Sequence, residues 1–243
     1  VKFNNMSNIF NLGLNCLDKD NNKKIIKNYL DKIDITKVKL ICDYIYLDTD
    51  ERRRFAQVSH EYLIEQLQFT GEESLSSQKV QLKLNFNHPC KELIWVIEKT
   101  NNTNVFNYTN NDDANPTGNW KPMGKALSSP EPYAYTGKNM VKTAKLQLNG
   151  HDRFSVRGGD YFNLVQPYQH HTNVPSKGIN VYSFGLKPEE HQPSGTCNMS
   201  RIDNANLSLE LESVTDGAVA RVYATNYNVL RIMSGMGGLA YSN

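Results

Sequence analysis

The sequence INVYSFGLKPEEHQPSGTCNMSR, residues 179–201, joins a strand-like run to a long polar loop. Its first part, residues 179–186, is rich in β-branched and aromatic residues, which favour a β-strand. Lys187 and Pro188 end that strand, because proline has no backbone N–H to donate to a neighbouring strand. The polar loop that follows carries no recognisable catalytic chemistry. The stretch therefore predicts a strand joined to a structural loop in a β-rich protein.

The chain has 243 residues, 39% of them hydrophobic, which is enough for the core of one large domain or two small ones. Its 27 basic and 25 acidic residues nearly cancel, so no overall field attracts nucleic acid or an anionic membrane. No apolar run approaches the roughly 18 residues that a membrane span needs. The cysteines at positions 16, 42, 90 and 197 include no Cys-x-x-Cys pair, so we expect reduced thiols and no zinc ribbon.

Apolar runs of two kinds predict strands. Residues 80–86 alternate between apolar and polar, as in a strand of a sheet that has one buried face and one solvent-exposed face. Residues 93–98 form a short continuous apolar run, and residues 38–47 are apolar on both faces, as in a strand covered on both sides. The strands predicted from these runs are residues 38–47, 80–86, 93–98, 141–150, 179–186, 205–211 and 219–233. Residues 60–69 fit neither the helical nor the strand period cleanly, and only the family resemblance given below makes them the eighth predicted strand.

The connections between these runs complete the prediction. Residues 51–57 predict a helical turn after an acidic lead-in, and a short helix is expected around residues 160–165. Asn149-Gly150 predicts a turn, and Asp216-Gly217 predicts a hairpin between the last two strands. Residues 100–139 are rich in proline and glycine and predict a long loop. The expected fold is all-β: an eight-stranded antiparallel jelly roll of two four-stranded sheets packed face to face, with short helices and long loops.

Histidine is the strongest sign of an enzyme in this sequence. A jelly-roll metalloenzyme needs a His-x-His pair, but the adjacent His170 and His171 cannot place both rings on one face of a strand. His191 and Cys197 lack the second pair of ligands that a zinc site requires. The sequence has neither a Gly-x-Ser-x-Gly nucleophile motif nor a phosphate-binding loop. We therefore expect no catalytic residues, no metal and no cofactor, and predict that the chain is not an enzyme.

Three blocks of sequence carry a resemblance to a known family. They are DYIYLDTDERRRFAQVSHEYLIEQLQ (43–68), LKPEEHQPSGTCNMSRIDNA (186–205) and ATNYNVLRIMSGMGGLAYSN (224–243). In this order they resemble the major capsid proteins of the nucleocytoplasmic large DNA viruses, the mimivirus, phycodnavirus and iridovirus group. The resemblance implies the carboxy-terminal roll of a double jelly roll, in residues 38–243, after a lead-in or inter-roll linker in residues 1–37. Since the chain holds one roll and begins at valine, we expect a portion of a longer polypeptide or the product of a divided gene.

The resemblance also implies partners and a location. Homotrimers would form pseudo-hexagonal capsomers of an icosahedral shell, touching neighbouring capsomers and minor capsid or cement proteins. The protein would reside in the capsid shell of the virion, assembled in the host cytoplasm, with no direct contact to nucleic acid and no membrane span. The expected interface anchors are the aromatic residues Trp120, Tyr133, Tyr168 and Tyr241, each of which could instead serve ordinary core or loop packing. Asn101 and Asn107 are expected acceptors for N-glycosylation.

Two other classes of function stay open on the sequence alone. A glycan-binding jelly roll at the virion surface would use exposed aromatics beside polar residues, such as Trp120 with Asn119 or Tyr108 with Asp112. A metal-dependent jelly-roll enzyme is the weaker alternative, because the ligand spacing described above is missing.

Overall fold

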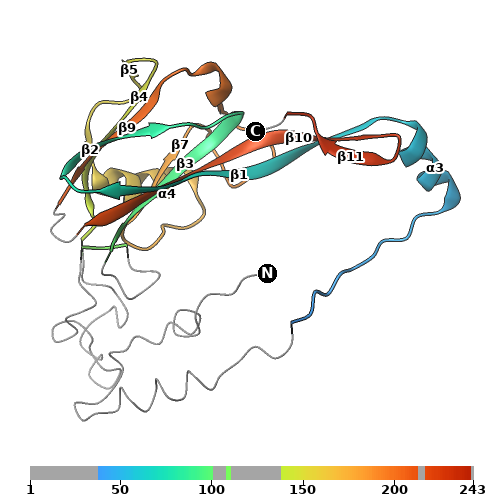
Figure 1. The fold of residues 1–243 in the computed structure, drawn as a ribbon, viewed down its shortest axis with the longest axis horizontal. Coiled ribbons are helices and arrows are strands. Elements are labelled where there is room, and N and C mark those ends of the chain that lie inside the picture. Colours follow the sequence, from blue (N-terminus) through green and yellow to red (C-terminus); the bar gives the residue numbers. More distant parts are fainter. Residues whose placement is uncertain (1–37, 101–107, 111–137, 213–216, 242–243) are drawn as a thin grey trace, which may run out of the picture. The chain divides into compact units, whose positions relative to one another are not determined.

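The computed structural model describes residues 38–100, 108–110, 138–212 and 217–241. By their contacts these residues fall into two units: residues 38–47 belong to the first, and all the others belong to the second. The second unit is a sandwich of two antiparallel sheets with a few short helices (Figure 1).

Sheet A contains four longer strands in the order β1-β10-β3-β7, and two short strands join it, β8 to β3 and β11 to β10. Their bounds are β1 His60–Leu75, β3 Pro89–Lys99, β7 Ile179–Ser183, β8 Cys197–Asn198, β10 Ala218–Met233 and β11 Met236–Leu239. Sheet B has the order β2-β9-β4-β5, with β6 also pairing with β4. Its strands are β2 Lys79–Leu84, β4 Val141–Leu148, β5 His151–Asp152, β6 Arg157–Gly158 and β9 Ala205–Leu211.

The path of the chain through these sheets is that of a jelly roll. The chain passes from β1 in sheet A to β2 in sheet B, returns to β3 in sheet A and moves on to β4 in sheet B. It later crosses from β7 to β9 and back to β10, which pairs with β1 along its whole length. This wrapping of one sheet over the other confirms the predicted all-β jelly roll.

Seven of the eight predicted runs are strands, and the prediction for residues 38–47 is wrong. This segment has no regular secondary structure, and all ten residues are exposed. The roll is closed without it, because the short strands β5 and β6 after the Asn149-Gly150 turn supply the remaining strand position beside β4. Apolarity on both faces indicates that a strand is covered, but not which sheet covers it.

The predicted hairpin at Asp216-Gly217 is also wrong. β9 lies in sheet B and β10 in sheet A, so the connection carries the chain between the sheets. Gly217 still adopts φ +81°, a backbone conformation that suits glycine. Asp216 lies outside the described residues, and the sequence did not show that the two flanking strands pair with different neighbours.

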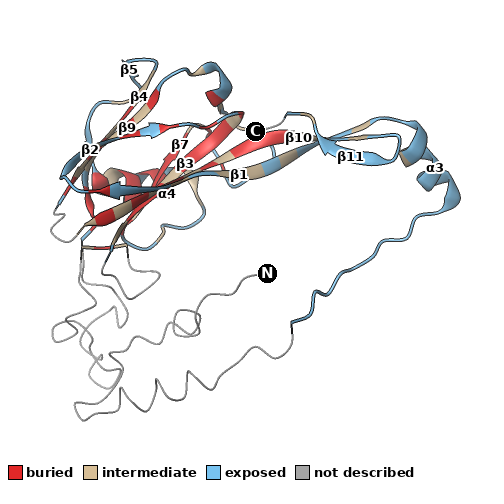
Figure 2. Ribbon diagram, viewed as in Figure 1, coloured by how far each residue is buried: buried red, intermediate tan, exposed pale blue. Residues whose placement is uncertain are grey.

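The core lies between the two sheets, where alternating side chains of both are buried (Figure 2). β10 turns small residues toward it: Ala218, Ala220 and Ala224 are at most 2% exposed. The neighbouring strand β3 fills the space they leave with large side chains, including Trp95, which is fully buried. Small residues on the central strand and large ones beside it let the two sheets pack closely.

Two of the short helices fall at predicted positions: α3 (Thr49–Gln57) includes the predicted range 51–57 and begins two residues earlier, and η2 (Tyr161–Val165) lies within the predicted range 160–165. α3 is capped by the Asp48 side chain, which accepts a hydrogen bond of 2.8 Å from the Glu51 N–H. The π-helical turn η2 leads into α4 (Gln166–His170). η2 places the Phe162 ring 5.2 Å from the Trp95 ring in the core. A third short helix, η3, covers Met199–Arg201. In the described part of the chain, no helix is both long enough and apolar enough to cross a bilayer.

Truncating one core side chain of sheet B tests this packing. Leu207 lies opposite Leu146 in the β9–β4 pair, and both are 1% exposed. We expect Leu207→Ala to lower the free energy of unfolding by about 2–5 kcal/mol, measured by urea denaturation. Ser208→Ala, on the wet face of the same strand, is the control and should change it by less than about 0.5 kcal/mol. Equal effects of the two substitutions would contradict the assignment of the faces.

Candidate assembly surface

The polar loop that follows β7, residues 186–201, is held against the outer face of sheet A, the face turned away from sheet B. A β-bulge in β3 makes this possible: Thr225 and Asn226 of β10 oppose Glu92 and Cys90, which leaves Lys91 without a partner on β10. Lys91 thereby reaches the same face as Glu65 and Tyr227, which lie opposite each other in β1 and β10.

The Lys91 ammonium is the anchor of this loop. Its side chain is only 3% exposed, and its Nζ donates hydrogen bonds to Glu65 Oε1 at 2.7 Å and to the Glu190 carbonyl at 2.9 Å. The Nζ also lies 4.9 Å from the centre of the Tyr227 ring. The Tyr227 hydroxyl in turn donates to the His191 carbonyl at 2.9 Å. One buried charge thus fixes two consecutive residues of the loop to three strands of sheet A.

Burial opposes the charged form of Lys91, but the interactions of its ammonium with Glu65 and Tyr227 outweigh that cost and raise the pKa of Lys91. A buried ammonium is stable only when it is paired and hydrogen-bonded. The charged Lys91 side chain therefore requires the polar loop to be bound against the sheet, where the Glu190 carbonyl accepts one of its hydrogen bonds.

The end of α4 holds the other side of the loop. The ring of His170 makes a hydrogen bond of 2.9 Å to the Leu186 carbonyl through Nδ1. The Thr172 N–H donates to Glu189 at 3.0 Å. Burial opposes the ionisation of Glu189, yet the hydrogen bonds from Thr172 prevail and lower the pKa of this carboxyl. His171, between them, contacts Glu92 of β3 with 2.6 Å between Nε2 and Oε2.

The histidines suspected of metal binding have structural contacts instead. His170, His171 and His191 each contact a carbonyl or a carboxylate, and His191 Nδ1 lies 3.3 Å from Glu65 Oε1. Among the residues that the structure describes, no group of three or more His, Cys, Asp or Glu side chains is arranged to hold a metal ion. The arrangement fixes a loop on a sheet.

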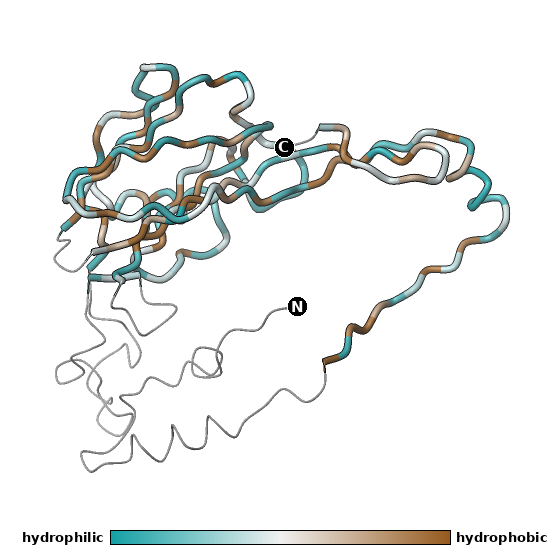
Figure 3. Tube along the Cα trace, in the orientation of Figure 1, coloured by the Kyte–Doolittle hydropathy of each residue, from teal (hydrophilic) through white to brown (hydrophobic). Residues whose placement is uncertain are grey.

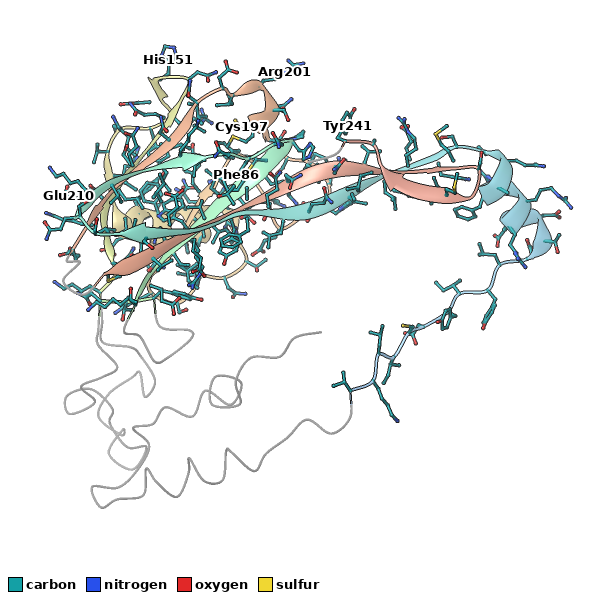
Figure 4. The ribbon with its side chains drawn as sticks, in the orientation of Figure 1. Phe86, His151, Cys197, Arg201, Glu210 and Tyr241 are labelled. Carbon is teal, nitrogen blue, oxygen red and sulfur yellow. The ribbon has the colours of Figure 1, made fainter. Side chains whose placement is uncertain are left out.

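Among the residues that the structure describes, Cys42, Cys90 and Cys197 form no disulfide bond. Cys90 and Cys197 lie opposite each other where β8 pairs with β3. Burial raises the pKa of both thiols, which keeps them protonated and poorly reactive. Figure 4 shows Cys197, in β8, beside β3, the strand that follows Phe86 in the chain.

A three-stranded arm extends from the roll beyond sheet B (Figure 1). We define the arm as α3, residues 60–66 of β1, residues 227–233 of β10 and all of β11. The register places Tyr62 opposite Leu230, and Leu230 opposite Leu239, so these side chains share the face that continues the core side of sheet A. Tyr62 is 45% exposed and Leu239 is 46% exposed. The arm therefore presents apolar surface outside the sandwich.

The structure places two of the four predicted interface aromatics. Tyr168, on α4, is 81% exposed, and Tyr241, after β11, is 61% exposed. Figure 4 shows Tyr241 at the base of the arm, so the two residues belong to different parts of the surface. Trp120 and Tyr133 lie outside the described residues, as do Asn101 and Asn107. Asn119 and Asp112, named for the glycan-binding alternative, also lie outside them.

Lys91 and the arm were missed by sequence reasoning. The lysine stands in an ordinary position before an apolar run, and only the register shift in β3 shows that it is an extra, buried residue. The glycines and methionines of residues 233–239 could have indicated a terminal hairpin, since Ser234-Gly235 forms a turn with both φ angles positive.

The fold and its polar network define a class of protein, a jelly-roll structural module. Its polar loop, residues 186–201, is part of the framework because its contacts hold it against sheet A. Comparisons with known proteins identify the family within this class. A family model described as large eukaryotic DNA virus major capsid protein matches residues 51–238. The chain belongs to this family, which is a structural one.

Two curated relatives illustrate the similarity. The major capsid protein of Pyramimonas orientalis virus is 55% identical over 227 residues, covering 84% of this chain and 48% of that protein. The major capsid protein of Paramecium bursaria Chlorella virus 1 is 49% identical over 236 residues, covering 83% of this chain and 53% of that protein. The chain thus spans about half the length of the curated relatives it matches.

Solved structures agree with this assignment. A quasi-atomic model of the PBCV-1 virus capsid matches with a TM-score of 0.64 and 41% identity, covering 82% of this chain and 56% of that chain. The Faustovirus major capsid protein matches with a TM-score of 0.51 and 14% identity, covering 75% of this chain and 35% of that chain, which shows the shared fold alone.

Replacing the anchor of the polar loop tests its role. We expect Lys91→Met to lower the free energy of unfolding by about 1–3 kcal/mol, because it leaves Glu65 and the Glu190 carbonyl without their buried donor. A double-mutant cycle with Glu65→Gln, followed by urea denaturation, should give a coupling energy of about 1 kcal/mol or more.

Lys187→Met is the matched control for Lys91→Met. Lys187 also pairs with a residue of the loop, Glu190, but the two side chains are 66% and 57% exposed. We expect a change of less than about 0.5 kcal/mol. If Lys91→Met changed the free energy of unfolding as little as Lys187→Met does, the attachment of the loop would not depend on the buried charge of Lys91.

Proposed function

We propose that this chain is the carboxy-terminal roll of a double-roll major capsid protein and that it forms part of the icosahedral shell of a large DNA virus. The observation that carries the proposal is the family match over residues 51–238 to proteins about twice as long, the part matched being one complete roll. A stiff sandwich with a clamped loop suits a component that must hold its shape while being repeated many times.

We further propose that residues 38–47 form a strand of the preceding roll. Ile41, Ile45 and Tyr46 are 87–91% exposed, although the segment is apolar on both faces. Such a strand is stable when sheets cover both its faces. The roll described above is complete without this segment, which supports a boundary at Asp48, with the residues before it serving the preceding roll and the linker.

Three double-roll proteins, each containing this roll and a preceding one, would form a pseudo-hexagonal capsomer, and the six rolls together would supply its six-fold outline. Capsomers would then contact one another and minor capsid or cement proteins in the virion shell, after assembly in the host cytoplasm. Many moderate interfaces repeated by symmetry would stabilise the shell. The near balance of basic and acidic residues supports a role without direct contact to nucleic acid.

The chain would act without catalysis, as a structural component. The carbonyl and carboxylate contacts of His170, His171 and His191 support this reading, because they hold the loop in place. Tyr168 and Tyr241 are the exposed aromatics proposed to pack against neighbouring subunits, since buried aromatic anchors dominate many interfaces.

The trimer is tested by the mass of the chain in solution. We expect light scattering after size exclusion to give a base species near three times the 27.6 kDa chain. Tyr168→Asp and Tyr241→Asp are to be tested separately. Each should lower the mass of this species toward that of a single chain where the replaced aromatic lies in the trimer interface, because an unpaired charge buried in an interface destabilises it.

Val156→Asp is the control, because Val156 is a 60% exposed apolar residue with no proposed contact. A wild-type chain that stays at 27.6 kDa would contradict the proposal that this roll carries the trimer contacts.

A further inference from the structure

The outer edge of β11 is a free strand edge. β11 pairs with β10 on one side, and no described residue pairs with its other side. All four of its residues, Met236–Leu239, are exposed. The strand carries no charge and no proline, the features by which proteins usually prevent an exposed edge from pairing. Figure 3 shows β11 in pale to brown colours, without a strongly hydrophilic residue.

The hairpin geometry determines which backbone groups point outward from this edge. Ser234 and Gly235 form a two-residue turn with φ of 52° and 76°, so Met233 and Met236 flank it as a hydrogen-bonded pair. Hydrogen-bonded and non-bonded pairs then alternate along the ladder. Gly237 and Leu239 are in non-bonded pairs with β10, so their N–H and C=O groups face the free edge.

Gly238 has no explanation within the chain. Its φ does not lie in the left-handed region, and a Cβ added to it would meet nothing within 4 Å. A glycine in a strand weakens the strand and often marks a place where another backbone approaches closely. The position of Gly238, between the two outward-facing residues, indicates such an approach.

We propose that the free edge of β11 pairs antiparallel with β11 of a second copy of this chain. Gly237 of each copy exchanges both backbone hydrogen bonds with Leu239 of the other, and the two Gly238 residues face each other at the two-fold axis. That central pair is non-hydrogen-bonded, the kind in which side chains come closest, about 4.5 Å between Cα atoms. Glycine is the residue that leaves this axis free of side chains.

A second copy fits this edge better than it fits the other free edge of the arm. Residues at a two-fold axis meet their own copies, so a charge there is repelled by itself. Met236–Leu239 carries no charge, whereas the arm portion of β1 carries Glu61 and Glu65. Pairing of β11 would also join the apolar faces of two arms, extending the surface that contains Leu230 and Leu239.

Gly238→Glu tests the contact without disturbing the roll. The new side chain has open space and lies opposite Arg231 in the β10–β11 pair, so the chain itself should tolerate it. At the two-fold axis, however, two carboxylates would face each other. Sedimentation velocity over a range of concentrations should show the wild-type species doubling in mass, while the Gly238→Glu chain keeps the mass of the undoubled species.

Gly158→Glu is the matched control. Gly158 is an exposed glycine of β6, its φ is also outside the left-handed region, and an added Cβ would meet only the Lys142 carbonyl at 4.0 Å. This variant should double in mass as the wild type does. Doubling that persists in Gly238→Glu would overturn the proposal.

Cysteine trapping detects the contact even when it is brief. In a background with Cys16→Ser and Cys42→Ser, Gly238→Cys should form a disulfide-linked dimer under mild oxidation by oxidised glutathione, because directly opposed Cα atoms are within disulfide reach. Gly158→Cys in the same background should remain a single chain on a non-reducing gel. If Gly238→Cys forms no more dimer than Gly158→Cys, the edge belongs to a different strand and the proposal fails.

The outcome is independent of the proposed trimer. The mass of the Gly238→Glu chain gives the base species, one chain or three, and thus reports on the capsomer. The ratio of the wild-type mass to that base species reports on β11. Because a trimer carries three β11 edges, its wild-type mass should be at least twice that of the base species. A trimer that gains no mass over the Gly238→Glu species would overturn only the β11 contact, and a monomer that doubles would overturn only the trimer.

Discussion

β10 lies in the middle of sheet A, between β1 and β3, and the packing of the whole roll follows from this position. This strand of 16 residues is bonded to β1 along one edge and to β3 and then β11 along the other. Its small residues face sheet B, and that space admits Trp95 and Phe162 to the core. Beyond sheet B the same strand continues as the centre of the arm, so one element links the packed core to the exposed surface.

The buried Lys91 ammonium determines how the outer face of sheet A is covered. A charge removed from water must be fully satisfied, and here Glu65 and the Glu190 carbonyl satisfy it. The carbonyl comes from the polar loop, so the loop is tied to the stability of the sheet beneath it. This gives the long polar loop a structural role, in which the contacts of its histidine and carboxylate groups help to hold it against the sheet.

Much of the fold could be predicted because its signals are local. The alternation of apolar and polar residues in 80–86 and 205–211 identifies strands with one solvent-exposed face, and Leu82 and Leu207 are buried as expected. What failed depends on distant partners. The apolar residues on both faces of residues 38–47 predicted a strand that is buried on both sides, but this pattern does not show which sheet buries it. Asp216-Gly217 predicted a hairpin, but the strands before and after it lie in different sheets. The bulge at Lys91 arises from the register between two strands about 130 residues apart, which no local pattern contains.

The jelly roll extends from His60 to Met233, and residues 38–47 are not part of it. Native-state hydrogen exchange of the 243-residue chain tests this most directly, because amides in a strand ladder are protected by the stability of the whole unit. The account predicts strong, shared protection in β1, β3, β9 and β10, and rapid exchange throughout residues 38–47. Protection of residues 38–47 equal to that of β1 would show that the segment is a strand of this roll, and would contradict the account.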